Sequence, residues 1–338
     1  MILLLSLAAL LLLLLLAGAI AWETTHPPRR TAAWAIAHGK PVDPGDLGLP
    51  FVEWTLDRPD GARMPVWEIA PARNGDDRGR TGRAANDATD GATHGAATDP
   101  RDARLCAIVL HGWGRSRIDS LGRVAALLRA ADVAAPGAID RVIVPELRGH
   151  GESGAEVSRL ADGEDADLLE LLRRIDAPSY VLAGHSMGGV VSILAAASDD
   201  PIAARVRGVI AWAPYTDVHV PMRNRLRARE APARPFTDAA LALLRIVGVR
   251  RRRTVPAAAR LRCPLLVIQG EGDIVSPLDG AEMIASAAPR GTFVLLPGAH
   301  PDVHEVASDA HRAAVAAFLR DDCGARAADH SGPSIDVR

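Results

Sequence analysis

Cysteine, lysine and aromatic residues are all scarce in this 338-residue chain. The three cysteines, Cys106, Cys263 and Cys323, are too few and too widely spaced for a disulfide framework, and no C-x-x-C pair indicates a zinc site. The net charge is -2, so no basic excess marks a nucleic-acid-binding protein. Hydrophobic residues make up 48% of the chain, enough for a full core. We therefore expect one large α/β domain with extra segments, or two domains, and neither a bound metal nor a nucleic-acid partner.

The first charge-free stretch, residues 2–22, is an apolar run in which eleven residues between Leu3 and Leu16 are leucine. As a helix it would extend roughly 31 Å, close to the thickness of the bilayer hydrocarbon. A soluble core helix is seldom apolar on every face. The run therefore predicts a single-pass membrane anchor.

A cleaved signal peptide is the alternative, because the run ends in Ala17-Gly18-Ala19 and Ala19-Ile20-Ala21, whose small residues suit a signal peptidase. The run lacks a basic stretch before it, and its length favours the anchor; secretion after cleavage stays open. Arg29, Arg30 and Lys40 follow the run, which weakly favours a cytoplasmic C-terminal side.

Residues 23–50 are interpreted as a linker, and residues 51–320 as the folded domain. Two short segments, 51–56 and 64–69, predict a hairpin around Pro59-Asp60-Gly61. Residues 72–104 contain few large apolar side chains, and we predict a disordered insertion there. Residues 321–338 are predicted to be a flexible tail.

From Leu105 onward, short apolar runs alternate with helical stretches. This alternation predicts a mostly parallel sheet with helices on both faces. The expected strands are 105–110, 141–144, 179–183, 206–212, 265–269 and 292–296. The expected helices are 120–131, 162–175, 187–198, 278–287 and 303–319. Residues 215–260 interrupt this strand–helix alternation and include a predicted helix near 237–247. We expect them to form a lid over the carboxyl edge of the sheet, where ligands bind in such folds.

The segment Gly184-His185-Ser186-Met187-Gly188 lies between an expected strand and an expected helix. That is the context of a nucleophile elbow, in which glycines on both sides of a serine let the strand and the helix approach closely. Ser186 is the predicted nucleophile. The backbone amides of Trp113, in His111-Gly112-Trp113-Gly114, and of Met187 are the predicted oxyanion hole.

The remaining two catalytic groups should follow in the order acid, then base. Asp273 comes directly after the strand 265–269 and is preferred over its competitor Asp217 as the acid. His300 follows the turn Pro297-Gly298-Ala299 and is the preferred base. His304, four residues later, remains the alternative base, although Pro301 suggests that it belongs to the first turn of the last helix.

Several neighbouring polar residues are given other roles. His185 is expected to pack on the far side of the elbow, and His150 to stabilise its own loop. Glu271 and Asp279 are expected to make surface or capping interactions. The run Arg250-Arg251-Arg252-Arg253 suggests a solvated face, or else docking of the lid onto anionic lipid headgroups.

Taken together, these motifs resemble those of the α/β-hydrolase superfamily. The resemblance covers residues 105–319 and rests on 111–114, 146–153, 184–188, 272–273 and 297–300. It is strongest toward the serine hydrolases that include monoglyceride-lipase-like and serine-aminopeptidase-like members. Glu146 departs from the usual Asp, and Gly298-Ala299-His300 lacks a second glycine before the histidine.

The resemblance implies hydrolysis of an ester, thioester or amide through an acyl-enzyme, with no metal or organic cofactor. The expected partners are a small-molecule acyl substrate, including lipids, and the membrane. Acyl transfer by the same triad is the alternative enzymatic function. A cofactor-free haloperoxidase activity and a non-catalytic binding protein that has kept the fold are further alternatives.

Overall fold

The computed structural model describes residues 1–71, 104–231, 233–301 and 303–325. The predicted insertion at 72–104 lies outside the described residues except for Arg104, and most of the predicted tail, 326–338, lies outside them as well. Residues 321–325 do not begin a tail: Cys323 and Ala325 are buried against the domain, because the last helical turn returns the chain to the core. The folded part therefore extends five residues beyond the predicted boundary.

Eight strands form a single sheet in the order β1-β2-β4-β3-β5-β6-β7-β8. The first two, β1 (Phe51–Asp57) and β2 (Arg63–Ile69), form the predicted hairpin, and β2 is antiparallel to both of its neighbours. The remaining pairs are parallel, as the alternation predicted. The strands are β3 (Leu105–Leu110), β4 (Ile139–Pro145), β5 (Tyr180–His185), β6 (Val206–Trp212), β7 (Leu265–Gly270) and β8 (Gly291–Leu296).

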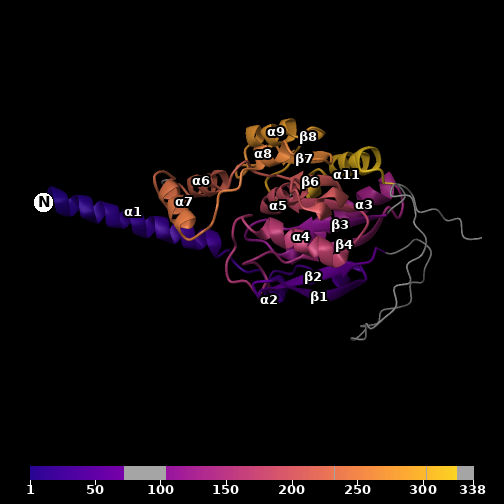
Figure 1. Ribbon diagram of the computed structural model, residues 1–338, viewed down its shortest axis with the longest axis horizontal. Helices are drawn as coiled ribbons and strands as arrows, with labels where there is room; N and C mark the ends of the chain where they lie inside the picture. Colours follow the sequence, from indigo (N-terminus) through magenta and orange to yellow (C-terminus); the bar gives the residue numbers. More distant parts are fainter. Residues whose placement is uncertain (72–103, 232, 302, 326–338) are drawn as a thin grey trace, which may run out of the picture.

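Helices cover both faces of the sheet, with β1 and β8 at its opposite ends (Figure 1). One core layer holds Leu182, Val209 and Val267 of the strands together with Leu168, Val190 and Ile284 of the helices α4 (Glu164–Ile175), α5 (Met187–Ala196) and α9 (Leu278–Ala287). The other layer packs Val181, Ile210 and Ile268 against α2 (Ala32–Ala37), α3 (Leu121–Ala134) and α11 (Ser308–Ala317). Successive strand residues thus face opposite layers, as the pleat requires.

The predicted helix 303–319 is wrong in detail. The segment consists of α10 (Val303–Val306), α11, and a wide helical turn at Phe318–Asp322. The helix near 237–247 is observed as α7 (Phe236–Ile246), but α6 (His219–Ala228) and α8 (Thr254–Ala258) were not predicted. Pro221 and the arginines of α6 obscure any apolar repeat, and α8 has only five residues, with a proline at its centre. Only α6 and α7 form a lid, because α8 packs against α5 and α9 of the body.

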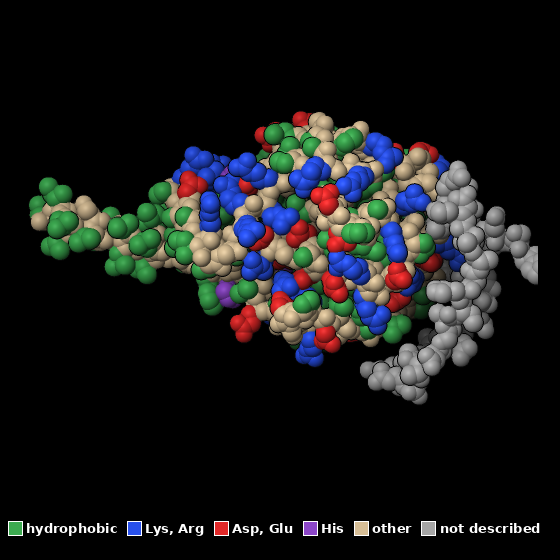
Figure 2. Space-filling model, viewed as in Figure 1, with side chains coloured by type: hydrophobic (Ala, Val, Ile, Leu, Met, Phe, Trp, Pro, Cys, Tyr) green, Lys and Arg blue, Asp and Glu red, His purple; other side chains and the backbone are tan. Residues whose placement is uncertain are grey.

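The N-terminal run forms α1 (Ile2–Thr25), which is the one helix in the described ranges long and apolar enough to cross a membrane. It projects from the body, and α7 packs beside its C-terminal half (Figure 1). On the face seen in Figure 2, the side chains of the projecting part are hydrophobic, whereas charged side chains of both signs are spread over the body. The helix is longer than the predicted anchor, because residues 23–25 continue it into the domain.

Residues 23–50 are not a free linker. Arg29 donates to the carbonyls of Ser153 and Ala155, and Arg30 pairs with Asp119 at 2.6 Å. Ala35 of α2 is fully buried. Because Arg29 and Arg30 bind the body, these two charges have a structural role beside the topological one inferred from the sequence.

Candidate active site

Ser186 lies on a sharp turn between β5 and α5, with a φ of 52° that is strained for a residue with a side chain. Glycines flank it for a steric reason. A Cβ at Gly184 would lie 2.2 Å from the carbonyl carbon of Gly188, and a Cβ at Gly188 would lie 2.5 Å from the carbonyl oxygen of His111. The amide of Ser186 donates to the Trp212 carbonyl at 2.7 Å, which ties the turn to β6.

The loop after β3 packs directly against this turn. A Cβ at Gly112 would lie 3.3 Å from the Cβ of Ser186 and 2.8 Å from Nδ1 of His185, so only glycine allows this approach. Within the described residues, the amides of Trp113 and Met187 donate to no protein acceptor. Met187 also begins α5, where free amides and the helix dipole favour negative charge.

The structure brings Asp273 and His300 together. Nδ1 of His300 lies 2.7 Å from Oδ2 of Asp273, and the Asp273 side chain is only 1% exposed. Oδ1 of Asp273 accepts the amides of Val275 and Ser276, both at 2.8 Å, and Oδ2 also accepts Nε2 of Gln269 at 2.9 Å. Three donors thus hold the carboxylate and fix its direction toward the imidazole. Nε2 of His300 is buried with no partner among the described residues, which leaves it available to accept a proton.

The two competing residues have other partners. Asp217 accepts both Nε and Nη2 of Arg251 and lies 2.9 Å from Nδ1 of His219. His304 is buried at the start of α10, where its Nε2 lies 3.5 Å from Glu305. Burial, with the nearby Arg123, lowers the pKa of His304 to about 3. The geometry therefore pairs His300 with Asp273, and neither Asp217 nor His304 takes part in this pair.

His185 is packed, as expected, but it also touches the loop that carries His300. Its Nε2 donates to the carbonyl of His300 at 2.7 Å, and the two rings are 4.7 Å apart. Burial lowers the pKa of His185 well below its usual range, so the ring is neutral. No sequence motif indicates this contact between His185 and the loop of His300.

His150 also matches its predicted role, since its Nδ1 lies 2.6 Å from the Arg148 carbonyl of its own loop. Glu146, the departure from the family pattern, lies 3.0 Å from Nε2 of His111. A Cβ at Gly151 would be 2.0 Å from the Glu146 carboxylate, so the longer acid requires glycine there.

The arginine run at 250–253, which lies between α7 and α8, is largely solvated, as predicted: Arg250, Arg251 and Arg253 are exposed. Two of its side chains also pair with acids elsewhere in the fold, Arg251 with Asp217 at 2.6 Å and Arg252 with Asp165 at 2.6 Å. The amide of Arg250 donates to Asp162. Docking onto anionic lipid headgroups stays a prediction.

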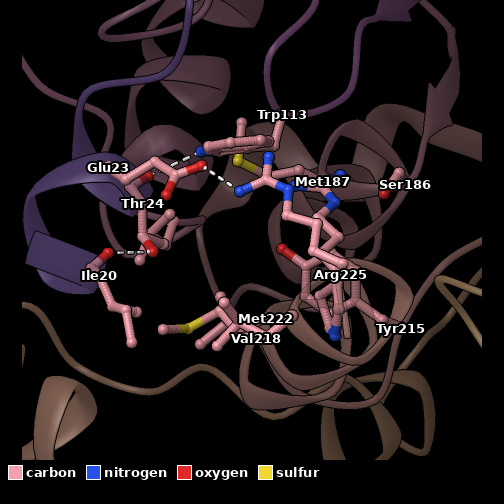
Figure 3. Close-up of a pocket in the computed structure, with 14 residues that line it drawn as sticks. Ile20, Glu23, Thr24, Trp113, Ser186, Met187, Tyr215, Val218, Met222 and Arg225 are labelled. Atoms are coloured by element: carbon pink, nitrogen blue, oxygen red, sulfur yellow. Dashed lines mark hydrogen bonds and ion pairs between the residues drawn. The ribbon is translucent and has the colours of Figure 1, made fainter. Parts of the chain in front are cut away.

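A cavity next to Ser186 is bounded by α1, α6 and the loop after β3 (Figure 3). Ile20, Glu23 and Thr24 of α1 line one side, and Ser186 lies on the opposite side. Nε1 of Trp113 donates to the Thr24 carbonyl at 2.7 Å, which joins α1 to the predicted oxyanion loop. The other lining residues are Leu160, Met187, Tyr215, Val218, Pro221, Met222, Arg225, Leu226 and Arg229.

Sequence reasoning missed the contribution of α1 to this cavity. The apolar composition of α1 indicates a membrane segment. It does not indicate whether the last turns of the helix contact the domain. Among the described residues, no group of three or more His, Cys, Asp or Glu side chains is placed to hold a metal ion.

Comparison with known proteins agrees with this architecture. Residues 107–318 match the model of the alpha/beta hydrolase family, so the chain belongs to that family. No curated protein matches the sequence.

Solved structures share the fold at low sequence identity. The esterase Pf2001 of Pyrococcus furiosus has 17% identity and a TM-score of 0.63, and the match covers 89% of this chain and 98% of that one. A hydrolase from Pseudomonas aeruginosa PA01 has 21% identity and a TM-score of 0.51 over 79% of this chain and 98% of its own. A membrane phospholipase A, described as a bacterial virulence factor, has 16% identity and a TM-score of 0.54 over 93% and 98%. These likenesses establish the fold.

Proposed function

We propose that the protein is a membrane-anchored serine hydrolase that cleaves a carboxylic ester through an acyl-enzyme. The observation that carries the proposal is the 2.7 Å contact between His300 and Asp273 at the same edge of the sheet as the strained Ser186 elbow. Thioesters and amides would pass through the same chemistry. The family and the esterases among its structural neighbours support the reaction class.

The proposed steps follow from the donors and acceptors of the site. Asp273 accepts a hydrogen bond from the Nδ1–H group of His300, which leaves Nε2 as the base. As Oγ of Ser186 bonds to the acyl carbon, its proton passes to Nε2, and the carbonyl oxygen becomes an oxyanion facing the amides of Trp113 and Met187. The bond to the alcohol then breaks, and His300 returns the proton to the leaving oxygen. Water repeats the sequence on the acyl-enzyme and releases the acid.

The proposed location is the membrane, with α1 as a single-pass anchor. One feature supports an uncleaved helix. Ala17 is fully buried and Ile20 lines the cavity, so cleavage within residues 17–21 would remove parts of the folded domain. The mean hydropathy of the helix, 2.9 in its most apolar window, suits a membrane span and a signal sequence equally. An acyl substrate held in the bilayer would lie close to the cavity, because the same helix forms both the anchor and the cavity wall.

The test compares Ser186→Ala with Ser192→Ala in purified full-length protein. Ser192 is a buried serine of α5, the helix that begins directly after Ser186, and its hydroxyl donates to the Gly188 carbonyl. Hydrolysis of 4-nitrophenyl butyrate should fall on the order of 10⁴-fold in Ser186→Ala. Ser192→Ala should stay near the wild-type rate. Equal activity of the Ser186 variant and the wild type would refute the proposed function.

A further inference from the structure

Arg225 of α6 brings a positive charge into a mostly apolar cavity. Its guanidinium lies 4.4 Å from the centroid of the Trp113 ring, and both residues line the same cavity as Ser186 (Figure 3). Trp113 directly follows Gly112, which touches Ser186. Arg225 therefore lies one side chain away from the predicted oxyanion loop.

Within the described residues, Arg225 forms no ion pair and no hydrogen bond. Two neighbouring arginines are neutralised: Arg223 of α6 pairs with Asp238, and Arg229, directly after α6, pairs with Glu23 at 2.9 Å. Glu23 is the one acidic residue lining the cavity, and it faces two arginines. The cavity thus keeps one uncompensated positive charge.

Leaving a guanidinium partly buried without a carboxylate is costly, because desolvation disfavours the charged form. Burial lowers the pKa of Arg225 below its usual value, although arginine stays protonated. Stacking on Trp113 compensates for part of this cost and fixes the plane of the guanidinium. Guanidinium N–H groups donate well to the oxygens of a carboxylate or a phosphate.

We infer that Arg225 selects esters whose alcohol half carries a negatively charged group, either a carboxylate or a phosphate. The inference rests on the proposed function, since it assigns the substrate class of the same site. Glu23 and Arg229, with side chains 52% and 62% exposed, mark the mouth of the cavity. The alcohol half of the ester is expected at this mouth. Ile20, Val218 and Met222 supply apolar surface for the acyl chain.

The experiment measures kcat/KM for two matched ester pairs. The first pair is 4-carboxyphenyl butyrate and the neutral 4-carbamoylphenyl butyrate. The second is monobutyryl glycerol phosphate and monobutyryl glycerol. In Arg225→Met, the ratio of anionic to neutral kcat/KM should fall by roughly 10- to 100-fold for at least one pair, as expected for one charge-assisted hydrogen bond. The pair that responds distinguishes a carboxylate from a phosphate.

Two variants separate charge from structure. Arg227→Gln, exposed on the same helix and outside the cavity lining, should keep the wild-type ratios. Arg225→Lys should keep most of the preference for the anionic ester. Unchanged ratios in Arg225→Met, or an equal loss in Arg225→Lys and Arg225→Met, would overturn the inference. Failure of the proposed function would appear differently, as hydrolysis that persists in Ser186→Ala.

Discussion

Single side chains decide which histidine can act as the base. His300 shares a hydrogen bond with Asp273, whereas His304 faces Glu305 and its pKa is held at about 3. The order of elements predicted this outcome, because Pro297-Gly298 returns the chain to the sheet edge and Pro301 precedes a helix. What the sequence could not predict is the donor set on Asp273, since Gln269, Val275 and Ser276 carry no motif.

The two histidines should differ in the chemical step. We expect His300→Ala to lower the acylation rate by about 10³-fold or more, because the nucleophile loses its base. His304→Gln should lower it only a few-fold. Single-turnover kinetics with 4-nitrophenyl butyrate measures acylation directly, and the reverse pattern would assign the base to His304.

At the scale of elements, α1 forms part of the cavity as well as the predicted anchor. Its residues 2–12 are exposed, whereas Ala17 and Thr25 are buried and the Thr25 carbonyl accepts the amide of Ser158. Hydropathy predicted the helix from composition alone. The packing of its last turns depends on α7 and Trp113, which lie far along the chain, so no local pattern could reveal it.

Two truncations separate the two roles of α1. Removing residues 2–12 should release the protein from the membrane while hydrolysis of a short soluble ester stays within a few-fold of wild type. Removing residues 2–25 should reduce kcat/KM by roughly tenfold or more, because the cavity loses one wall and Trp113 loses its acceptor. Equal activity of the two truncated proteins would show that α1 does not shape the site.

The contact between α11 and β6 makes stability depend on pH. Nε2 of the buried His311 accepts Nε1 of Trp212 at 2.7 Å, and burial lowers the pKa of His311 to about 4. A histidine in the unfolded chain has a pKa near 6.5. Between these values the unfolded state binds a proton that the folded state does not, so stability falls as the pH falls.

His311→Gln keeps an acceptor for Trp212 and removes this titration. On the order of 1–2 kcal/mol of the acid destabilisation between pH 7 and pH 5 should disappear in the variant. Thermal unfolding in detergent at the two pH values measures the effect. A Tm that drops equally in the variant and the wild type would exclude His311 as a source of the acid sensitivity.

At the scale of the whole molecule, strand–helix alternation predicted the sheet, its parallel pairs and the edge that carries the site. Alternation reflects burial on both faces, which the sequence records directly. The lid was predicted only from an interruption of the strand–helix alternation. After α7, Arg251 pairs with Asp217 and Arg252 pairs with Asp165. The partners in each pair lie far apart in the sequence, so the pairings depend on the finished fold.

The whole molecule should behave as an integral membrane protein. Full-length protein expressed with its own N-terminus should stay in the membrane pellet after alkaline carbonate extraction, at the mass of the complete chain. The 2–12 truncation should appear in the supernatant. A full-length gene product found shortened in the medium would identify residues 2–22 as a signal peptide.

The central claim is that Ser186 is the nucleophile activated by His300 and Asp273, and covalent trapping tests it most directly. A fluorophosphonate should add one phosphonyl group per chain, and peptide mass analysis should locate it on Ser186. Labelling should be lost in Ser186→Ala, strongly slowed in His300→Ala, and retained in His304→Gln. A label on another residue, or labelling that persists in Ser186→Ala, would contradict the account.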